Sequence, residues 1–216
     1  MERINKHYVS DYLQNLIPDH DPLMAEFRRT CEASHIPIIH KEVGQLIRFL
    51  IQIKQATRVL EIGTAVGFSA IFMSRIINDP NGYITTLERS PHMLEKAHSN
   101  LENYEHPTPI TLLQGEATEL LPRLTKPYDI LFLDGAKSKY QQFYQSAKKC
   151  LVPGGLIISD NVLHKGMTAT DSLVVRRQRT IVREMRAYLD YLSTHPDLET
   201  TVLPLGDGVA ISYIKP

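Results

Sequence analysis

Residues 128–137 read Tyr-Asp-Ile-Leu-Phe-Leu-Asp-Gly-Ala-Lys, an apolar run of strand length that ends in the acid Asp134. A second run of the same kind, residues 154–159, is followed by the pair Asp160-Asn161. In a parallel sheet the C-terminal ends of the strands lie along one edge, where open α/β folds bind their ligands. The two stretches therefore predict a parallel sheet whose polar residues meet at that edge.

Strands and helices alternate along the chain from residue 57 onward. Strands separated by helices are typical of an α/β fold, with a mainly parallel sheet covered by helices on both faces. The turn pattern Gly206-Asp207-Gly208 predicts a C-terminal hairpin, which places one antiparallel strand in a seven-stranded sheet. The predicted strands are Arg58–Ile62, Tyr83–Glu88, Ile110–Gln114, Ile130–Asp134, Leu156–Asp160, Thr200–Leu205 and Val209–Ile214. The predicted helices between them are Ser69–Ile77, Pro91–Asn103, Lys139–Leu151 and Asp171–Ser193.

The first quarter of the chain shows helical patterns and no strand. We interpret residues 1–55 as an N-terminal helical extension and residues 56–216 as the main domain of a single globular unit. Asp21-Pro22 predicts a helix start, and Val43, Ile47 and Ile51 share one face of a later helix. A chain of 216 residues is long enough to bury the core of such a domain.

Composition narrows the classes of function. The chain has 24 Lys and Arg residues and 24 Asp and Glu residues, so net charge favours neither nucleic acid nor membrane, although a local basic patch is compatible with it. Cys31 and Cys150 are far apart and follow no metal-binding spacing, so we expect free, partly buried thiols. No apolar signal core opens the chain, and no stretch approaches the roughly 20 apolar residues of a membrane span, so we expect a cytoplasmic protein.

The acids at the two strand ends are candidate metal ligands. Asp134, Asp160 and Asn161 would supply two carboxylates and an amide oxygen, a set of oxygen ligands that suits Mg²⁺. Helix capping is the alternative, since Asp and Asn favour N-caps, but capping does not require an Asp-Asn doublet. Lys137 lies three residues past the first acid, where it could serve as a base. The pattern therefore indicates metal-assisted chemistry on an oxygen atom.

A glycine-containing turn follows the first predicted strand. Residues 61–67 read Glu-Ile-Gly-Thr-Ala-Val-Gly, and glycines at such a turn let the backbone approach a ligand closely. Ala65 departs from the dinucleotide pattern G-x-G-x-x-G, and Glu61 lies just before Gly63. Both features favour a cationic cofactor without phosphate over NAD. The alternative is an ordinary strand–turn–helix corner, because isolated glycine patterns are weak evidence.

Two further acids follow the next strands at the same edge. Glu88 ends the second strand, where α/β nucleotide-binding proteins place an acid that holds the ribose hydroxyls. Glu116 and Ala117 follow the third strand and could border an adenine. The alternatives are a solvated acid at a strand end and a polar loop.

Arginines are concentrated in the predicted helix Asp171–Ser193. Such a cluster is either a solvated face or a patch that contacts the phosphates of RNA. Lys165, after Asp160-Asn161, and Lys137 and Lys139, near Asp134, would extend the patch. No RNA-binding module is recognisable in the sequence. The arginines are Arg176, Arg177, Arg179, Arg183 and Arg186.

These motifs together resemble the metal-dependent O-methyltransferases of the catechol and caffeoyl-CoA type, which are class I S-adenosylmethionine-dependent methyltransferases. The resemblance rests on residues 60–69, 87–89, 134–137 and 160–162, and it spans most of residues 36–214. It implies a Rossmann-like fold, S-adenosyl-L-methionine as cofactor and Mg²⁺ or another divalent cation as metal.

The resemblance also implies roles for individual residues. Ile39 and Ser69 would contact the methionine end of the cofactor, with Glu61 and Gly63 at the adjoining turn. Asp134, Asp160 and Asn161 would bind the metal, Asp134 would also lie near the cofactor, and Lys137 would be the catalytic lysine. Glu88 would hold the ribose, and Glu116 and Ala117 would border the adenine.

Within this family, the chain is most similar to bacterial enzymes that act on tRNA. They methylate 5-hydroxyuridine at the wobble position 34, giving 5-methoxyuridine. The similarity rests on residues 36–39, 136–140, 160–166 and 204–212. It implies that tRNA, through its anticodon stem-loop, is the partner of Lys165, Arg176, Arg177 and Arg179, and that the enzyme is a homodimer.

Two other functions compete with tRNA methylation. An O-methyltransferase for a small catechol-like phenol would use the same metal site, because a catechol and a 5-hydroxyuridine each offer two adjacent oxygens. A nucleotide-binding protein without methyl transfer, such as an NAD-dependent reductase, is disfavoured by Ala65 and by the doublet Asp160-Asn161.

Overall fold

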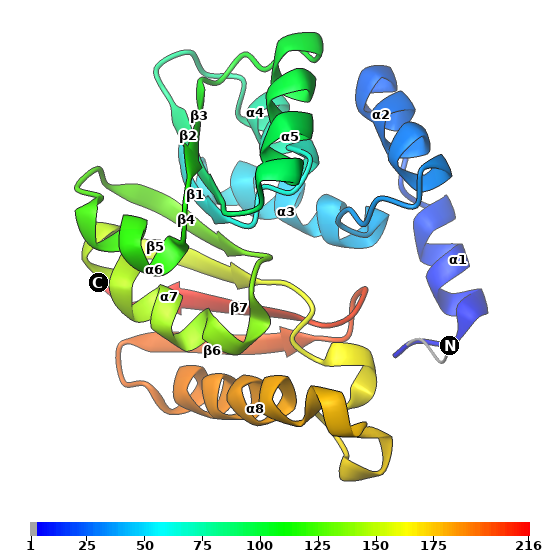
Figure 1. The fold of residues 1–216 in the computed structure, drawn as a ribbon, viewed down its shortest axis with the longest axis vertical. Helices are drawn as coiled ribbons and strands as arrows, with labels where there is room; N and C mark the ends of the chain where they lie inside the picture. Colours follow the sequence, from blue (N-terminus) through cyan, green and yellow to red (C-terminus); the bar gives the residue numbers. More distant parts are fainter. Residues whose placement is uncertain (1–3) are drawn as a thin grey trace.

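A seven-stranded sheet with the strand order β3-β2-β1-β4-β5-β7-β6 forms the centre of the computed structural model, which describes residues 4–216 (Figure 1). All neighbouring strands are parallel except that β7 runs antiparallel to β5 and β6. The mainly parallel α/β sheet with a C-terminal hairpin is therefore confirmed. Its strands are β1 (Arg58–Ile62), β2 (Tyr83–Glu88), β3 (Ile110–Gln114), β4 (Tyr128–Leu133), β5 (Leu151–Ser159), β6 (Leu198–Leu203) and β7 (Val209–Ile214).

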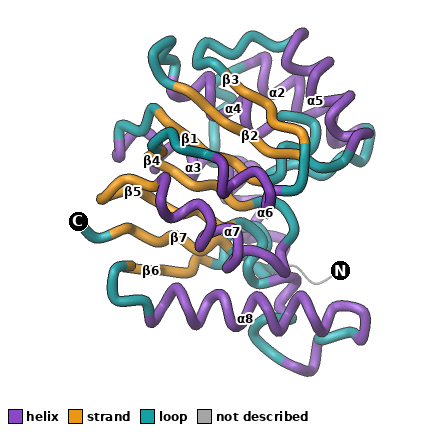
Figure 2. Tube along the Cα trace, turned by 60° about the vertical axis from the view of Figure 1, so that its left-hand side comes forward, coloured by secondary structure: helices purple, strands orange, loops and turns teal. Residues whose placement is uncertain are grey.

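Helices cover both faces of the sheet. Figure 2 shows α6 and α7 crossing one face, with α3 and α4 on the other. The α-helices are α1 (His7–Asn15), α2 (Pro22–Ala33), α3 (Lys41–Lys54), α4 (Phe68–Ile77), α5 (Pro91–Asn103), α6 (Ala117–Leu120), α7 (Tyr140–Ala147) and α8 (Arg179–Thr194). Short 3-10 turns lie at Leu121–Arg123, Lys137–Lys139, Lys148–Cys150, His164–Gly166, Asp171–Leu173 and Arg176–Gln178.

The central strand β4 explains the two-sided core. Ile130 and Phe132 pack into a cluster with α2, α3 and α4 on one face. Leu131 and Leu133 pack with α7 and α8 on the other face. A strand that is buried on both faces reads as a continuous apolar run, which is why residues 128–133 have no alternation of polar and apolar side chains.

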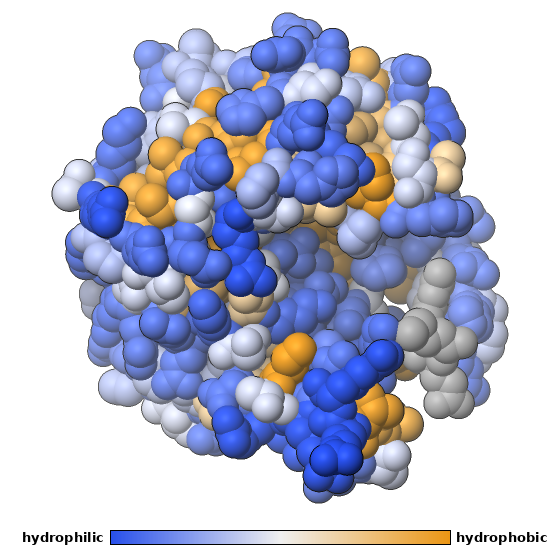
Figure 3. Space-filling model, viewed as in Figure 1, coloured by the Kyte–Doolittle hydropathy of each residue, from blue (hydrophilic) through white to orange (hydrophobic). Residues whose placement is uncertain are grey.

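The N-terminal helices stand opposite the edge where the parallel strands end (Figure 1). Met24 and Phe27 of α2 and Val43 and Ile47 of α3 belong to the same buried cluster as the sheet. The predicted extension 1–55 thus packs on the main domain, and its residues 1–3 lie outside the described residues. Figure 3 shows a hollow lined largely by hydrophilic residues near the ends of β4 and β5.

Several predicted boundaries are wrong by a few residues. β4 begins at Tyr128, β5 begins at Leu151, and β6 is Leu198–Leu203 rather than residues 200–205. The predicted helix 139–151 is shorter and continues into a 3-10 turn. The short helix α6 had not been predicted.

Composition led us to expect free, partly buried cysteines and no apolar stretch of membrane-spanning length, and the structure agrees with both expectations. Cys31 and Cys150 are free and buried. Among residues 4–216, no helix combines the length and the apolar character needed to cross a membrane.

Candidate active site

The turn after β1 approaches the end of β4 so closely that it requires glycine. Gly63 has a φ of 107°, and a Cβ at this position would clash with the backbone carbonyl of Asp134. The backbone N–H of Asp134 donates to the carbonyl of Ile62 at 3.0 Å. The glycine turn and the first acid therefore form one continuous wall at the edge of the sheet.

A cleft of about 290 Å³ follows this wall. Its lining brings together residues from the ends of four strands that lie far apart in the sequence. Five of the predicted site residues line it: Gly63, Glu88, Glu116, Ala117 and Asp134. The cleft is thus where the sequence placed the cofactor.

Backbone donors hold the Glu88 carboxylate in this cleft. It accepts hydrogen bonds from the N–H groups of Ala65 at 2.9 Å, Arg89 at 2.9 Å and Ser90 at 2.8 Å. Ala65 has a φ of 47°, so the turn is bent sharply toward Glu88. These three donors fix the orientation of the carboxylate at the wall of the cleft.

Glu116 lies between two cations at the other end of the cleft. Its carboxylate contacts the Arg89 guanidinium at 3.1 Å and the Lys139 ammonium at 3.5 Å. The hydrogen bond from Arg89, helped by the charge of Lys139, lowers the pKa of Glu116. The pairing of these two cations with Glu116 was not predicted from the sequence.

The two predicted metal ligands face each other. Asp160 is 1% exposed, and its backbone N–H donates to the carbonyl of Leu133 at 2.9 Å, which holds the two strand ends together. Loss of solvent raises the pKa of both Asp134 and Asp160 to about 7; Glu61 adds to the shift at Asp134, and the Asp134 charge adds to it at Asp160. Lys137 opposes both shifts. The positive charge around this pair of carboxylates is therefore too small to keep their pKa values at the usual level.

Asn161 adjoins the pair in a left-handed conformation with a φ of 57°, and its N–H donates to the Asp160 carboxylate at 2.7 Å. Within residues 4–216, no three His, Cys, Asp or Glu side chains form a group suited to a metal ion. A metal at this site would therefore have two carboxylate ligands and would need the amide oxygen of Asn161 as a further protein ligand.

Tyr140 and His40 complete the surroundings of Asp160. The Tyr140 hydroxyl donates to the backbone carbonyl of Asp160 at 3.1 Å, and its ring is buried. The charge of His40 acts to lower the pKa of Asp160, so this residue also faces the site. His40 was missed because it comes from the extended segment before α3, far from the strand-end motifs.

The turn between β6 and β7 holds the segment that follows Asn161. The carbonyl of Asp207 accepts from the N–H of Leu163 at 3.0 Å, and its carboxylate accepts from the N–H of Lys165 at 2.5 Å. The carbonyl of Gly208 accepts from the N–H of Val162 at 2.9 Å. A distant hairpin thus fixes the backbone beside the candidate metal site.

Glu61 and Ser69 lie behind the glycine turn rather than in the cleft. Both are buried, and the Thr86 hydroxyl donates to Glu61 Oε2 at 2.5 Å. Glu61 Oε1 has no hydrogen-bond partner within the described part of the chain. Burial raises the pKa of Glu61 to about 7, although the hydroxyls of Ser69 and Thr86 oppose the shift.

Replacing Glu61 by Gln should make the protein more stable at alkaline pH. The native state keeps a proton on Glu61 up to pH 7, whereas the unfolded chain loses it near pH 4.5, so this residue lowers stability as pH rises through that window. The expected gain is on the order of 3 kcal/mol at pH 8 and close to zero at pH 4. Urea unfolding of wild type and Glu61→Gln at both pH values measures it, and an equal difference at both pH values would contradict this assignment.

The other predicted residues are spread around the site. Ile39 is buried and lines a different cavity, of about 650 Å³, between α1, α2 and residues 36–41. Lys165 and Arg179 are exposed. Arg176 and Arg177 are exposed too, but their placement on the long helix is wrong, because α8 begins only at Arg179 and they lie on the 3-10 turn before it.

Comparison with known proteins gives one consistent result. A family model described as O-methyltransferase matches residues 14–214. A catechol O-methyltransferase of Niastella koreensis is 29% identical over 97% of this chain and 96% of its own length.

Solved structures agree with this match. A Staphylococcus aureus protein provisionally named a caffeoyl-CoA O-methyltransferase superposes with a TM-score of 0.89 at 30% identity, covering 96% of this chain and 99% of that one. An O-methyltransferase from Bacillus cereus, solved in complex with SAH, has a TM-score of 0.82 at 26% identity, covering 96% and 97% of the two chains.

Proposed function

The chain belongs to the O-methyltransferase family, and from this premise we propose that it methylates a hydroxyl group that lies beside a second oxygen atom. It is an S-adenosylmethionine-dependent enzyme with the class I methyltransferase fold. The observation that carries the proposal is the pair Asp134 and Asp160, two carboxylates that face each other at the ends of neighbouring strands with Lys137 beside them.

The residues of the cleft fit the cofactor. Glu88 presents a carboxylate, held by three backbone N–H groups, that suits the hydroxyls of a ribose. Gly63 gives the close backbone approach, and Glu116 and Ala117 border the other end. Glu61 has a buried oxygen without a partner, which fits an ammonium group near the turn. Ser69, buried behind the turn, is the remaining candidate for the methionine end, whereas Ile39 lines a different cavity.

The residues at the strand ends fit a divalent cation. Asp134 and Asp160 repel each other in a setting with little solvent, and a cation between them would remove that cost. Carboxylate and amide oxygens, as Asn161 would supply, are ligands that Mg²⁺ prefers. When bound, the metal would supply the positive charge that acidifies an acceptor hydroxyl.

The protein's own residues then have separate roles in the reaction. Lys137 takes or shares the hydroxyl proton of the acceptor as the new oxygen–carbon bond forms and the sulfur–carbon bond of the cofactor breaks. Tyr140 holds the backbone of Asp160, and the turn at Asp207 holds the segment after Asn161. Fixing both reactants in line supplies much of the remaining acceleration.

A catechol-like phenol is the first candidate acceptor. Two adjacent ring oxygens match a site built for one cation and one base. The relatives named catechol O-methyltransferase, which align over nearly their whole length, support this substrate class.

A 5-hydroxyuridine at the wobble position of tRNA is the second candidate, because it also offers two adjacent oxygens. Three arginines favour it: Arg176, Arg177 and Arg179 are exposed and form no ion pair within residues 4–216. Arg183 and Arg186, by contrast, are paired with Glu184 at 2.7 Å and Asp171 at 2.6 Å. Free guanidinium groups near Lys165 suit the phosphates of an anticodon stem.

One assay separates the two acceptors. The purified enzyme receives S-adenosylmethionine with a labelled methyl group, together with either catechol or tRNA from cells that lack the wobble methyltransferase, with and without EDTA. Label in a methoxyphenol supports the first acceptor, and label in 5-methoxyuridine supports the second. Methyl transfer that persists in EDTA would contradict the proposed need for a metal. An absence of transfer to either acceptor would contradict the proposed substrate class.

Removing the Asp207 carboxylate should weaken binding of the metal without affecting binding of the cofactor. Asp207→Ala loses the acceptor of the Lys165 N–H and frees the segment beside Asn161, so we expect metal affinity to fall by about 10-fold. Titration calorimetry with Mn²⁺ and, separately, with SAH measures both. Equal losses for the two ligands would indicate general unfolding, and no loss for Mn²⁺ would contradict the coupling.

The homodimer stays a prediction. Tyr8, Tyr12 and Leu16 lie along one face of α1 and are 67%, 64% and 59% exposed, and such a face suits a second copy of the chain. Sedimentation of wild type and Tyr12→Glu would test it, since a charge in this face should favour the monomer.

A further inference from the structure

A small cavity between α2, α3 and α4 gathers cations away from the candidate active site. Its volume is about 60 Å³, room for a small oxyanion, and it shares no lining residue with the cleft described above. Arg28, Lys41 and Arg48 line it, together with Phe68 and Phe72.

The two arginines stack on the two aromatic rings of the cavity. The Arg28 guanidinium lies 4.8 Å from the ring centre of Phe68, and that of Arg48 lies 5.6 Å from the ring centre of Phe72. The rings are themselves stacked, with centres 6.3 Å apart. This packing fixes both planar groups. It leaves the N–H edge of Arg48 available for an acceptor, together with the N–H groups of Arg28 that do not donate to Ile39.

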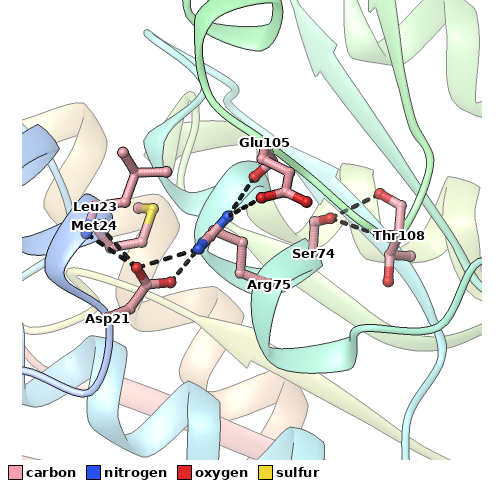
Figure 4. Close-up of polar contacts among 7 residues, drawn as sticks. All are labelled: Asp21, Leu23, Met24, Ser74, Arg75, Glu105 and Thr108. Atoms are coloured by element: carbon pink, nitrogen blue, oxygen red, sulfur yellow. Dashed lines mark hydrogen bonds and ion pairs between the residues drawn. The ribbon is translucent and has the colours of Figure 1, made fainter.

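The two acids that line the cavity, Asp19 and Asp21, are each already in an ion pair. Figure 4 shows Asp21 engaged with Arg75 and with the first turn of α2. Arg75 contacts it at 2.5 and 3.3 Å, and the N–H groups of Leu23 and Met24 also donate to it. Asp19 is paired with Lys41 at 3.2 Å.

Arg48 therefore has to share the charge of Asp21 with Arg75. No carboxylate within residues 4–216 forms an ion pair with it, and burial lowers its pKa. Arg28 donates to the carbonyl of Ile39 at 2.8 Å, and its nearest acid, the exposed Glu32, lies 3.8 Å away. A half-buried guanidinium without a closely paired anion is costly, so an incoming anion would be favoured.

We propose that this cavity binds a phosphate-class anion between Arg28 and Arg48. Arg28 and Lys41 also line the larger cavity at residues 36–41, so the cationic surface continues toward His40 and the candidate active site. The anion is either free inorganic phosphate or a phosphate group of a larger acceptor that reaches this surface. The site is independent of which hydroxyl the enzyme methylates.

Calorimetric titration with sodium phosphate, against sodium chloride at equal ionic strength, tests the site. Wild type should bind, and Arg48→Met, which keeps the apolar stem on Phe72, should bind at least about 10-fold more weakly. Arg123→Met is the matched control, because Arg123 is exposed on the turn Leu121–Arg123 and should leave binding unchanged. Arg48→Lys, which keeps the charge, should lose less and provides a second variant if the first folds poorly.

Two results would overturn the proposal: no phosphate binding by wild type, or equal binding by wild type and both Arg48 variants. The source of the anion follows from inhibition. Phosphate that competes with tRNA but not with catechol indicates a phosphate of the acceptor, and phosphate that binds without competing with either indicates free phosphate. The binding titration needs no methyl transfer, so it stands even if the proposed acceptors fail.

Discussion

Asp160→Asn is expected to weaken metal-dependent methyl transfer severely while leaving the fold intact. The substitution removes one of two facing carboxylates, and its amide oxygen still accepts from the N–H of Asn161. Losing a charged ligand of a catalytic cation should lower kcat/KM on the order of 10³-fold, equivalent to about 4 kcal/mol. Initial rates over a range of Mg²⁺ concentrations measure the loss.

The stability of the same variant should change in the opposite direction. Without metal, Asp134 and Asp160 repel each other in a region with little solvent, so removing one charge at pH 8 should stabilise the protein by about 1–2 kcal/mol. Urea unfolding in EDTA measures this gain. Asp190→Asn, on the exposed side of α8, is the matched control and should change neither quantity. An active but destabilised Asp160→Asn would contradict the metal site.

Strands that are bounded by turn residues were predictable from sequence alone. β1, β2, β3 and β7 agree residue for residue with their predicted ranges. β4 was predicted too short because Asp129 looks like a loop residue. Its carboxylate is instead bound by the Arg58 side chain and by the N–H groups of Thr57 and Arg58, which makes an acid compatible with a buried strand.

The start of β5 was also predicted wrongly, because its first residues look like a turn. It begins at Leu151 and passes through Pro153, Gly154 and Gly155, which normally indicate a turn. Gly154 has a φ of 73°, and the register against β4 shifts between Tyr128 and Ile130, so the strand continues across an irregularity. No local pattern announces such a continuation.

Some residues of the candidate site were predictable from the sequence and others were not. Asp134, Asp160 and Glu88 were predictable because parallel topology brings strand ends together. His40, Arg89 and Lys139 were not, because their contacts depend on how distant segments pack. The arginines before α8 were placed on the helix because the charge pattern is continuous, whereas residues 176–178 form a 3-10 turn and the α-helix begins only at Arg179.

Lys137→Met is expected to lower kcat by about 10²–10⁴-fold, the usual contribution of a positioned acid–base group. Lys137 lies near both Asp134 and Asp160, since its charge opposes the pKa shift of each. It is therefore placed beside the position where an acceptor hydroxyl would lose its proton. Single-turnover methylation of catechol at saturating Mg²⁺ measures the chemical step.

A more acidic acceptor distinguishes proton transfer from positioning. If Lys137 takes the proton, a nitro-substituted catechol, whose hydroxyl ionises without help, should lose far less rate in Lys137→Met than catechol does. If Lys137 only orients the acceptor, both acceptors should lose rate equally, which would contradict its role as base. Lys139→Met serves as the control, because Lys139 belongs to the same turn but pairs with Glu116, and it should leave kcat nearly unchanged for both acceptors.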